Sequence, residues 1–218
     1  MRYVIMANGR GTRWGEHLGL PKHLIEFDGE TLLRRLVRQL REQDPGSDIV
    51  ISSANPTYET EGARRHVPRA NELELDRFVP ELISDRVCFL YGDTLYGDAA
   101  ISSIVHTPIE ELDFFGDEDG IVAVRSAAPD VLLTHLAKVR ELFLAGEIAA
   151  CVGWQVYQSY AGLPFDEKRT GVHFHRTSGQ AAGFNSPADL EAFEEWFAAT
   201  PGAAAHAGFR SEQRRHAH

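Results

Sequence analysis

Two glycines and two arginines directly follow the first apolar run of the sequence. The stretch ANGRGTRW covers residues 7–14, and a Pro-Lys pair follows at Pro21-Lys22. Glycine allows backbone N–H groups to approach an anion closely, and arginine can donate paired hydrogen bonds to phosphate oxygens. A plain glycine turn with solvated arginines is the alternative interpretation. The Pro-Lys pair favours the first interpretation, so residues 7–22 predict a phosphate-binding loop.

Neither of the two commonest phosphate-loop motifs fits this stretch. The dinucleotide motif G-x-G-x-x-G, begun at Gly9, requires a glycine where Trp14 stands, and Gly15 comes one residue too late. A P-loop requires Gly-Lys-Ser/Thr, which does not follow. We therefore expect another class of phosphate-binding protein.

The distribution of charge limits the partners. Residues 1–41 hold eight Lys or Arg against four Asp or Glu, whereas the whole chain holds 22 against 32, a net charge of −10. An acidic body repels polyanions such as nucleic acid or an anionic membrane, while a locally basic segment can still hold a small phosphate compound. We expect a small anionic ligand and no nucleic-acid or membrane partner.

Cysteine usage and the absence of long apolar runs indicate the compartment. No apolar run approaches the ~20 residues of a membrane span, and the first residues lack the pattern of a signal peptide. Cys88 lies in the apolar run VCFLY, where a buried reduced thiol is expected, and Cys151 is the only other cysteine. We therefore expect a cytoplasmic protein without a disulfide or a cysteine-based zinc site.

Four nearly continuous apolar runs predict strands that are covered on both faces. They are residues 3–7, 49–54, 87–91 and 121–124, and such runs are typical of a central parallel sheet. Between the first two runs, residues 31–43 carry leucines on one stripe and arginines opposite, which predicts an amphipathic helix. Weaker helical patterns cover residues 98–107, 129–146 and 186–199.

The alternation of strands and helices predicts an α/β fold. No internal repeat and no long linker divides the chain. We expect one domain over residues 1–199, followed by a flexible tail over residues 200–218, where the periodicity is lost.

The loop and its surroundings resemble the start of the nucleotidyltransferase family, which includes sugar-phosphate and MobA-like NTP transferases. Family members read roughly L-A-A-G-x-G-T-R, then a variable stretch, then P-K-x-L-x-x-x-x-G-x-x-L-L, and residues 7–33 follow this pattern. LYGDTLYG, residues 90–97, resembles the family segment that holds the metal-binding aspartate. GFNSPADLEAF, residues 183–193, resembles the late segment before the closing helix. Residues 55–85 and 126–180 show no family pattern.

The resemblance implies a fold and a reaction. The fold would be a three-layer α/β/α sandwich of the Rossmann-like GT-A type with a mostly parallel sheet. A phosphate oxygen of an acceptor would attack the α-phosphorus of an NTP and expel pyrophosphate. Lys22 resembles the lysine that stabilises charge on the attacked phosphate, and Arg13 the residue that holds the triphosphate. The implied nucleotide contacts are Ala7, Asn8, Gly9, Gly11, Thr12, Arg13, Lys22 and Gly92.

Asp93 and Asn185 are the candidate ligands of a Mg²⁺ ion. Asp93 ends an apolar strand, and ligands of α/β sheets collect at the carboxyl ends of strands. A carboxylate there suits Mg²⁺, which takes one or two protein ligands and keeps waters; a helix-capping aspartate is the alternative. Asn185 falls where many relatives place a second metal-binding aspartate, and a turn-forming role before Ser186-Pro187 explains it equally well.

Two departures from the family pattern concern the nucleotide base. Asn8 replaces a small Ala or Gly, and His23 replaces the common Pro, so we expect base recognition near position 8 to differ from that of familiar members.

Lys22 and Arg13 are both expected in an exposed loop, where truncation lowers activity without changing stability.

The polar and aromatic clusters elsewhere in the sequence give weaker indications of function. The run Asp113, Asp117, Glu118 and Asp119 lacks the order of an EF-hand and predicts a solvated turn. His173 and His175 share one face of an expected strand, where acceptor contact or plain surface is favoured over a metal site. Trp154, Tyr157 and Tyr160 recur at helical spacing, which is typical of core packing and leaves lining of the acceptor site as the minor alternative. Arg64, Arg65 and Arg169 are further candidates for the acceptor phosphate.

The acceptor and the base stay open. A sugar 1-phosphate is the first choice, choline phosphate or another phospho-alcohol the second, and a molybdopterin-type compound the third. A GT-A glycosyltransferase would show an Asp-x-Asp pair, whereas Asp93 is followed by Thr94 and Leu95. A catalytically silent nucleotide-binding domain is the remaining alternative, and the presence of both Lys22 and Asp93 favours an active transferase.

Overall fold

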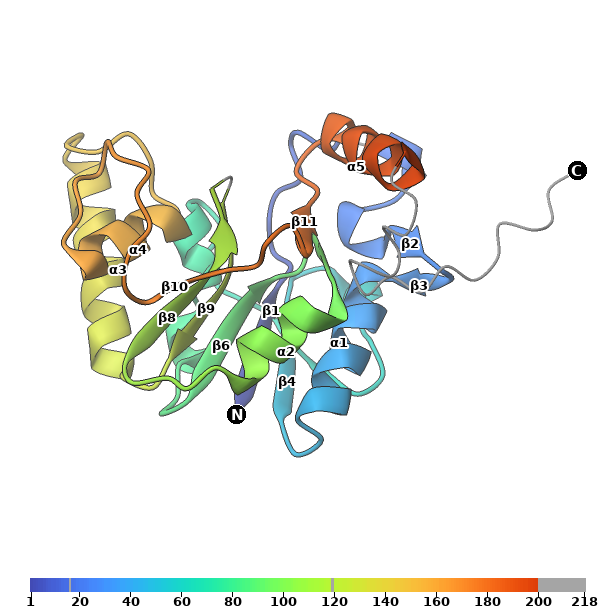
Figure 1. The fold of residues 1–218 in the computed structure, drawn as a ribbon, viewed down its shortest axis with the longest axis horizontal. Helices are drawn as coiled ribbons and strands as arrows, with labels where there is room; N and C mark the ends of the chain where they lie inside the picture. The colour runs from blue at the N-terminus through green and yellow to red at the C-terminus, as the bar shows by residue number, and fades with distance from the viewer. Residues whose placement is uncertain (16, 119, 200–218) are drawn as a thin grey trace, which may run out of the picture.

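The computed structural model describes residues 1–15, 17–118 and 120–199 as one central sheet between two layers of helices (Figure 1). The expected tail, residues 200–218, lies outside the described residues. Across the seven-stranded sheet the order is β10 (Phe174–Arg176), β8 (Leu112–Asp117), β9 (Gly120–Ser126), β6 (Val87–Tyr91), β1 (Arg2–Met6), β4 (Asp48–Ser52) and β5 (Arg64–His66).

Most of the sheet is parallel, as expected. β1 pairs in parallel with both β4 and β6, and β4 does so with β5. The exception is β9, which pairs antiparallel with β6 and β8. The placement of residues 121–124 in a parallel strand is therefore wrong. β9 begins only three positions after β8 ends, whereas a parallel connection needs a crossover of a dozen or more residues.

Two helices cover each face of the sheet. Alternate side chains of β1 point to opposite faces, so Tyr3 and Ile5 pack in one core with α1 (Leu32–Gln43) and α2 (Asp98–His106). Val4 and Met6 pack in the other core with two further helices. These are α3 (Pro129–Leu144) and α4 (Gly153–Ala161). The burial of the central strands β1, β4 and β6 on both faces explains why their runs are continuously apolar.

The expected helices are present. α1 begins at Leu32, because the Thr31 side chain accepts a hydrogen bond from the Arg34 N–H group at 3.2 Å and caps the helix. The helix α5 (Pro187–Ala199) lies beside a small hairpin formed by β2 (Glu26–Phe27) and β3 (Glu30–Thr31) (Figure 1). Among the described helices, none is long and apolar enough to cross a membrane.

Short strands and 3-10 helices complete the described chain. A second small sheet pairs β7 (Thr94–Tyr96) with β11 (Ala181–Gly183). The 3-10 helices are η1 (His17–Gly19), η2 (Lys22–Leu24), η3 (Pro56–Tyr58), η4 (Glu74–Arg77) and η5 (Pro80–Leu82).

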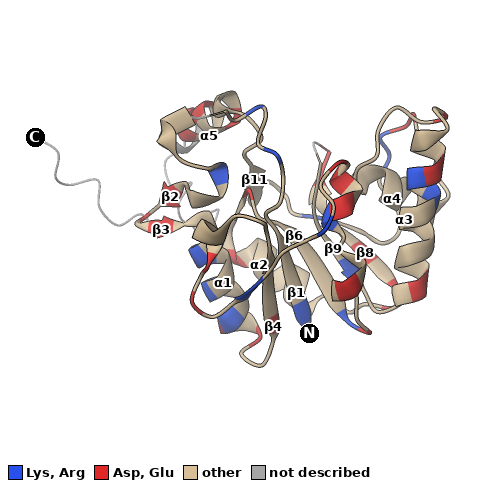
Figure 2. Ribbon diagram, turned by 180° about the vertical axis from the view of Figure 1, so that it is seen from behind, with Lys and Arg blue, Asp and Glu red and all other residues tan. Residues whose placement is uncertain are grey.

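The basic charge of residues 1–41 lies largely on α1, where Figure 2 shows a group of Lys and Arg positions. Arg38 pairs there with Glu30 and Glu42, and Arg41 donates to backbone carbonyl groups. No arginine of α1 lines either of the two cavities described below. Arg38 and Arg41 therefore support the local structure, whereas Arg10, Arg13 and Lys22 of the same basic segment line the cavities.

Candidate active site

The glycine loop (residues 7–13) and Asp93 meet at one edge of the sheet. β1 and β6 are neighbouring parallel strands, and their last residues, Met6 and Tyr91, lie opposite each other. The residues that follow both strands must therefore lie side by side, as the sequence predicts. Gly92 makes this approach possible, because an added Cβ would lie 3.1 Å from the carbonyl oxygen of Met6.

A buried ion pair joins Lys22 to Asp93. Nζ of Lys22 contacts Oδ2 of Asp93, and each side chain is only 7% exposed. Burial by itself would raise the pKa of Asp93, but the nearby positive charges, Lys22 first among them, outweigh it and lower the pKa. Asp93 is therefore a carboxylate at neutral pH. The expectation of an exposed Lys22 is wrong, because η2 turns the side chain inward; Arg13 is exposed as expected.

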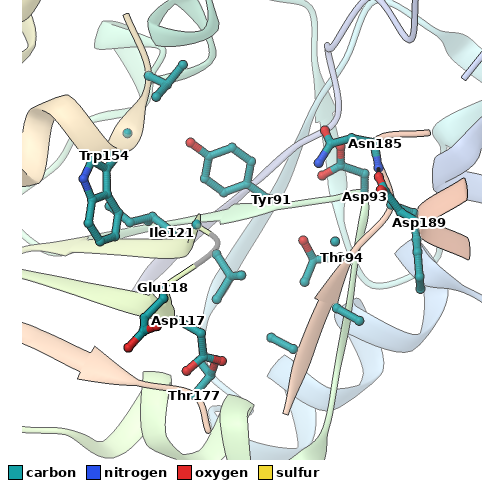
Figure 3. A pocket seen from close by; sticks show the side chains of 18 of the residues that line it. Tyr91, Asp93, Thr94, Asp117, Glu118, Ile121, Trp154, Thr177, Asn185 and Asp189 are labelled. Atoms are coloured by element: carbon teal, nitrogen blue, oxygen red, sulfur yellow. Dashed lines mark hydrogen bonds between the residues drawn. The ribbon is translucent and has the colours of Figure 1, made fainter. Parts of the chain in front are cut away.

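Two cavities lie on either side of this pair. The smaller cavity, of about 610 Å³, is lined by Lys22 and by parts of the glycine loop, among them Ala7, Asn8, Gly9 and Gly11. The larger cavity, of about 1060 Å³, is lined by Asp93 (Figure 3). Arg13 lines the larger cavity, while Thr12 and Gly92, both predicted as nucleotide contacts, line neither.

Two amide side chains, Asn8 and Asn55, line the smaller cavity. The Oδ1 atom of Asn8 accepts a hydrogen bond from the Ala54 N–H group at 3.2 Å. Oδ1 of Asn55 accepts from both the N–H and hydroxyl groups of Thr57, at 3.0 and 2.8 Å. Because a backbone N–H group can only donate, these contacts fix the orientation of both amides. The Asn55 side chain also hydrogen-bonds the Tyr58 hydroxyl group, so Asn8 is the amide whose NH₂ group has no partner among the described residues and can face a ligand.

His23 and Tyr58 close the same cavity. Nδ1 of His23 lies 3.0 Å from the hydroxyl oxygen of Tyr58. Burial, together with the charge of Lys22, lowers the pKa of His23 to about 4. The imidazole at this departure from the family pattern is therefore neutral at physiological pH.

Asn185 lies beside Asp93, as the metal-site interpretation requires (Figure 3). The pairing of β11 with β7 continues into a hydrogen bond of 2.8 Å from the Phe184 N–H group to the Asp93 carbonyl oxygen. Asn185 also belongs to a turn, because its N–H group donates to Oδ2 of Asp189 at 2.8 Å. Its backbone makes the turn while its exposed side chain lines the larger cavity.

The donor set fits Mg²⁺ and not a metal that needs a full set of protein ligands. Among the described residues, no three His, Cys, Asp or Glu side chains gather to hold an ion. One ionised carboxylate and one neighbouring amide oxygen match an ion that takes few protein ligands and completes its shell with water and phosphate oxygens.

The arginines lie differently from the expectation. Arg10 donates to the carbonyl oxygens of Asn71 and Glu72, both at 2.9 Å, and so anchors that segment. The three acceptor-phosphate candidates are occupied elsewhere and do not line the larger cavity. They are Arg64, paired with Asp48, Arg65, paired with Glu59, and Arg169, paired with Glu167.

Arg77 lines the larger cavity and was missed by the sequence motifs. It lies in the 55–85 stretch that shows no family pattern, and a single arginine there carries no recognisable signal. Its guanidinium group lies over Gly9, where an added Cβ would be 3.1 Å from Nη2.

The acidic residues between positions 113 and 119 have different structural roles. Asp113 is buried and lies 2.6 Å from Nε2 of His175, so its place in a solvated turn is wrong. Asp117 accepts from the Thr177 hydroxyl group at 2.5 Å and holds the wall of the larger cavity. Asp119 lies outside the described residues.

His173 precedes β10 and is not part of it. Trp154 and Tyr157 are buried in the core as predicted, while Tyr160 packs partly buried against it. Trp154 also lines the larger cavity (Figure 3).

Comparison with known proteins gives a family match for the first part of the chain and a fold match for most of it. Residues 3–77 match the family model of the MobA-like NTP transferase domain, and no curated protein sequence matches the chain. The fold matches the CTP:phosphocholine cytidylyltransferase of Streptococcus pneumoniae with a TM-score of 0.55 and 15% identity, covering 90% of this chain and 98% of that one.

Two further structures share the fold. The inositol-1-phosphate CTP transferase of T. maritima has a TM-score of 0.53 and 15% identity, covering 88% of this chain and 93% of that one. A Bacillus anthracis protein assigned as a glucose-1-phosphate thymidylyltransferase has a TM-score of 0.61 and 13% identity, covering 98% of both chains. The resemblance that the motifs predicted is thus confirmed: residues 3–77 carry the MobA-like NTP transferase pattern, and the described chain has the fold of the solved nucleotidyltransferases.

Proposed function

We propose that this protein is a nucleotidyltransferase of the class EC 2.7.7, which transfers a nucleoside monophosphate from an NTP to a phosphorylated small molecule and releases pyrophosphate. The observation that carries the proposal is the buried Lys22–Asp93 pair between two cavities at the carboxyl edge of the sheet. A single-substrate binding protein has no need of two cavities that share one charged pair.

The proposed roles follow from the position of each residue. The NTP lies in the smaller cavity, with its phosphates along the glycine loop, and the acceptor lies in the larger cavity. A phosphate oxygen of the acceptor forms a bond to the α-phosphorus, and the bond from the α-phosphorus to the bridging oxygen of the leaving pyrophosphate breaks. Lys22 neutralises charge on the α-phosphate, and Arg13 holds the phosphates from the larger cavity. Protein acid–base chemistry is not required.

Asp93 and Asn185 would hold a Mg²⁺ ion at the junction of the two cavities. When bound, the ion supplies positive charge that reduces the repulsion between the two phosphate groups. Asp93 serves two purposes in this proposal, since Oδ2 positions Lys22 and Oδ1 is available as a ligand. Asn185 contributes a neutral oxygen from the segment that follows β11.

The size of the larger cavity, about 1060 Å³, favours an acceptor of sugar size. A sugar 1-phosphate is our first choice because polar groups line much of that cavity, and a phospho-alcohol or a molybdopterin-type compound is the alternative. A glycosyltransferase is disfavoured by Thr94 and Leu95, which stand where an Asp-x-Asp pair would continue. Cys88 and Cys151 are free thiols, which fits a reducing compartment such as the cytoplasm.

The proposal is tested by incubating the purified protein with each of four NTPs, Mg²⁺ and a panel of phosphorylated acceptors while pyrophosphate release is recorded. The panel contains sugar 1-phosphates, phosphocholine and other phospho-alcohols, each beside its unphosphorylated parent compound. We expect release with one NTP and one class of phosphorylated acceptor. A parallel incubation supplies NDP-sugars and the unphosphorylated compounds in place of the NTPs. Release of a nucleoside diphosphate there, with no pyrophosphate from any NTP, would instead identify a glycosyltransferase.

A further inference from the structure

The guanidinium group of Arg77 is left without a partner by the rest of the described chain. Arg77 ends η4, and its Nε atom is buried with no hydrogen-bond partner among the described residues. Its neighbours in the sequence and in space are occupied, because Arg10 binds backbone carbonyl groups and Arg140 pairs with Asp76. A partly buried cation without partners is costly unless a ligand completes its hydrogen bonds.

The turn that carries Arg77 is firmly anchored. Oδ2 of Asp76 accepts from two backbone N–H groups of the same turn, at 2.7 and 2.8 Å, while Oδ1 pairs with Arg140 of α3. Oε1 of Glu74 accepts from the Tyr91 hydroxyl group at 2.8 Å. The position of Arg77 is therefore set by the surrounding structure, and the unpaired guanidinium group is not explained by a loose surface loop.

The guanidinium group faces the ion pair from the acceptor side. Its plane lies over Gly9, and its charge acts on Asp93 together with that of Lys22. Arg77 lines the larger cavity and not the smaller one. Arg77 and Asp93 line the same cavity, so an anion bound there can reach both the guanidinium group and the junction at which Asp93 pairs with Lys22.

We propose that Arg77 binds the phosphate group of the acceptor substrate and holds it against the site of transfer. This inference rests on the proposed function. Two N–H groups of a guanidinium can donate in parallel to two phosphate oxygens, which fixes the orientation of the phosphate as well as its position. Gly9 has a second role in this arrangement, because a side chain there would displace the guanidinium group.

The test measures binding of inorganic phosphate by the linewidth of its ³¹P NMR signal, with and without each NTP, in the wild type, Arg77→Gln and Arg140→Gln. Arg140→Gln is the matched control. It removes an arginine that supports the same turn but does not line either cavity. We expect Arg77→Gln to weaken phosphate binding at least ~10-fold, the scale of a lost hydrogen bond to a charged group, while NTP binding persists.

Each outcome separates this inference from the proposed function. Equal phosphate binding in wild type and Arg77→Gln, or equal losses in Arg77→Gln and Arg140→Gln, would overturn the role of Arg77. A larger loss of NTP binding than of phosphate binding would also overturn it, because Arg77 would then belong to the nucleotide half. Phosphate binding that depends on Arg77 in a protein that binds none of four NTPs would support the inference and contradict the proposed function.

Once an acceptor is known, turnover gives a second readout. Arg77→Gln should raise the KM for the phosphorylated acceptor more than the KM for the NTP, and Arg77→Lys should restore part of the loss as a single point charge. A purely structural residue would instead lower the melting temperature and affect both substrates alike.

Discussion

The two cavities on either side of the Lys22–Asp93 pair draw on different parts of the chain. The smaller cavity is lined by residues 7–11, 14–15 and 19–23 and by a few residues that follow β4. The larger cavity takes side chains from positions as distant as Arg13, Gln155 and Asp189. The first is thus built from two short segments, whereas the second exists only when the whole sheet and its helices are assembled.

Under the proposed function, this difference corresponds to a part that would serve any NTP and a part that would have to fit one acceptor. Phosphate groups are common to all NTPs, so a loop of glycines and cations serves them in every case. An acceptor site is formed by loops and helix ends that can change without disturbing the sheet. Variants on each side of the ion pair should accordingly have separable effects, and variants of the pair should affect both sides.

The largest expected effect is that of Asp93→Ala. Removal of this carboxylate takes away the partner of Lys22 and the proposed metal ligand, so turnover should fall by at least ~10²-fold, the scale of lost electrostatic stabilisation. Pyrophosphate release measured with the best NTP and acceptor checks this. Turnover near that of the wild type would show that the junction between the cavities is not the reaction centre.

Lys22 tests whether the pair is structural as well as functional. Lys22→Met leaves a buried carboxylate unpaired and should cost about 3–5 kcal/mol in the free energy of unfolding, measured with urea. The double variant Lys22→Met/Asp93→Asn removes both charges and should recover most of this stability without recovering activity.

The pH dependence provides the control for Lys22→Met. The pKa of Asp93 is below its ordinary value of 3.8 in the folded protein. The stability that the ionised Asp93 contributes is therefore present above pH 3.8 and is lost as the pH falls through the lowered pKa. The stability difference between the wild type and the double variant should change in that acidic range. If the difference in the free energy of unfolding between the two proteins stays constant through that range, the ion pair is not its cause.

Arg13 gives the contrast to Lys22 in the same segment. Its side chain is exposed, so Arg13→Ala should change the free energy of unfolding by no more than about 0.5 kcal/mol. Turnover should fall at least ~10-fold, because a charge-assisted contact to phosphate is lost. Thermal unfolding and kinetics of the same preparation check both quantities. Parallel losses of melting temperature and activity would mean that Arg13 supports the loop.

Asn185 separates a metal ligand from a turn residue. Because its side chain is exposed and its backbone makes the turn, Asn185→Leu should leave stability nearly unchanged and raise the Mg²⁺ concentration for half-maximal activity. Asn185→Asp should be tolerated or should lower that concentration, since a carboxylate keeps the oxygen and adds charge. An unchanged Mg²⁺ midpoint in Asn185→Leu leaves Asp93 as the only protein ligand named here.

Asn8 is expected to have the smallest effect, and only on the nucleotide side. Loss of one neutral hydrogen bond is worth about 0.5–1.5 kcal/mol, so Asn8→Ala should change the ratio of kcat/KM between the best NTP and the next by roughly 2- to 10-fold. The KM for the acceptor should stay the same. A changed acceptor KM would indicate that the two cavities are not independent.

Much of the lining of the smaller cavity could be predicted from the sequence, because most of its residues are close together in the chain. The glycine loop, Lys22 and the strand-end Asp93 are recognisable from type and spacing, and the paired strands β1 and β6 bring them together. The burial of Lys22 was not predictable from the loop alone, because it depends on a partner 71 positions away.

The acceptor side could not be predicted for the same reason. Arg77 is one arginine among many in the sequence, and only the packing of η4 against Gly9 distinguishes it. In the sequence Arg64, Arg65 and Arg169 cannot be told apart from it, whereas in the structure each of these three pairs with an acidic residue. The antiparallel direction of β9 likewise depends on its short connection to β8, although its apolar pattern is that of a parallel strand.

The central claim is that the Lys22–Asp93 pair is the point of transfer between the two cavities. The most direct measurement follows the α-phosphate of a ³²P-labelled NTP into the acceptor in the wild type and in Lys22→Met/Asp93→Asn, after urea unfolding has shown that both are folded. For the wild type we expect label in the acceptor product, with one pyrophosphate released per transfer. For the double variant we expect no label above background. Label transfer by the folded double variant at a rate near that of the wild type would contradict it.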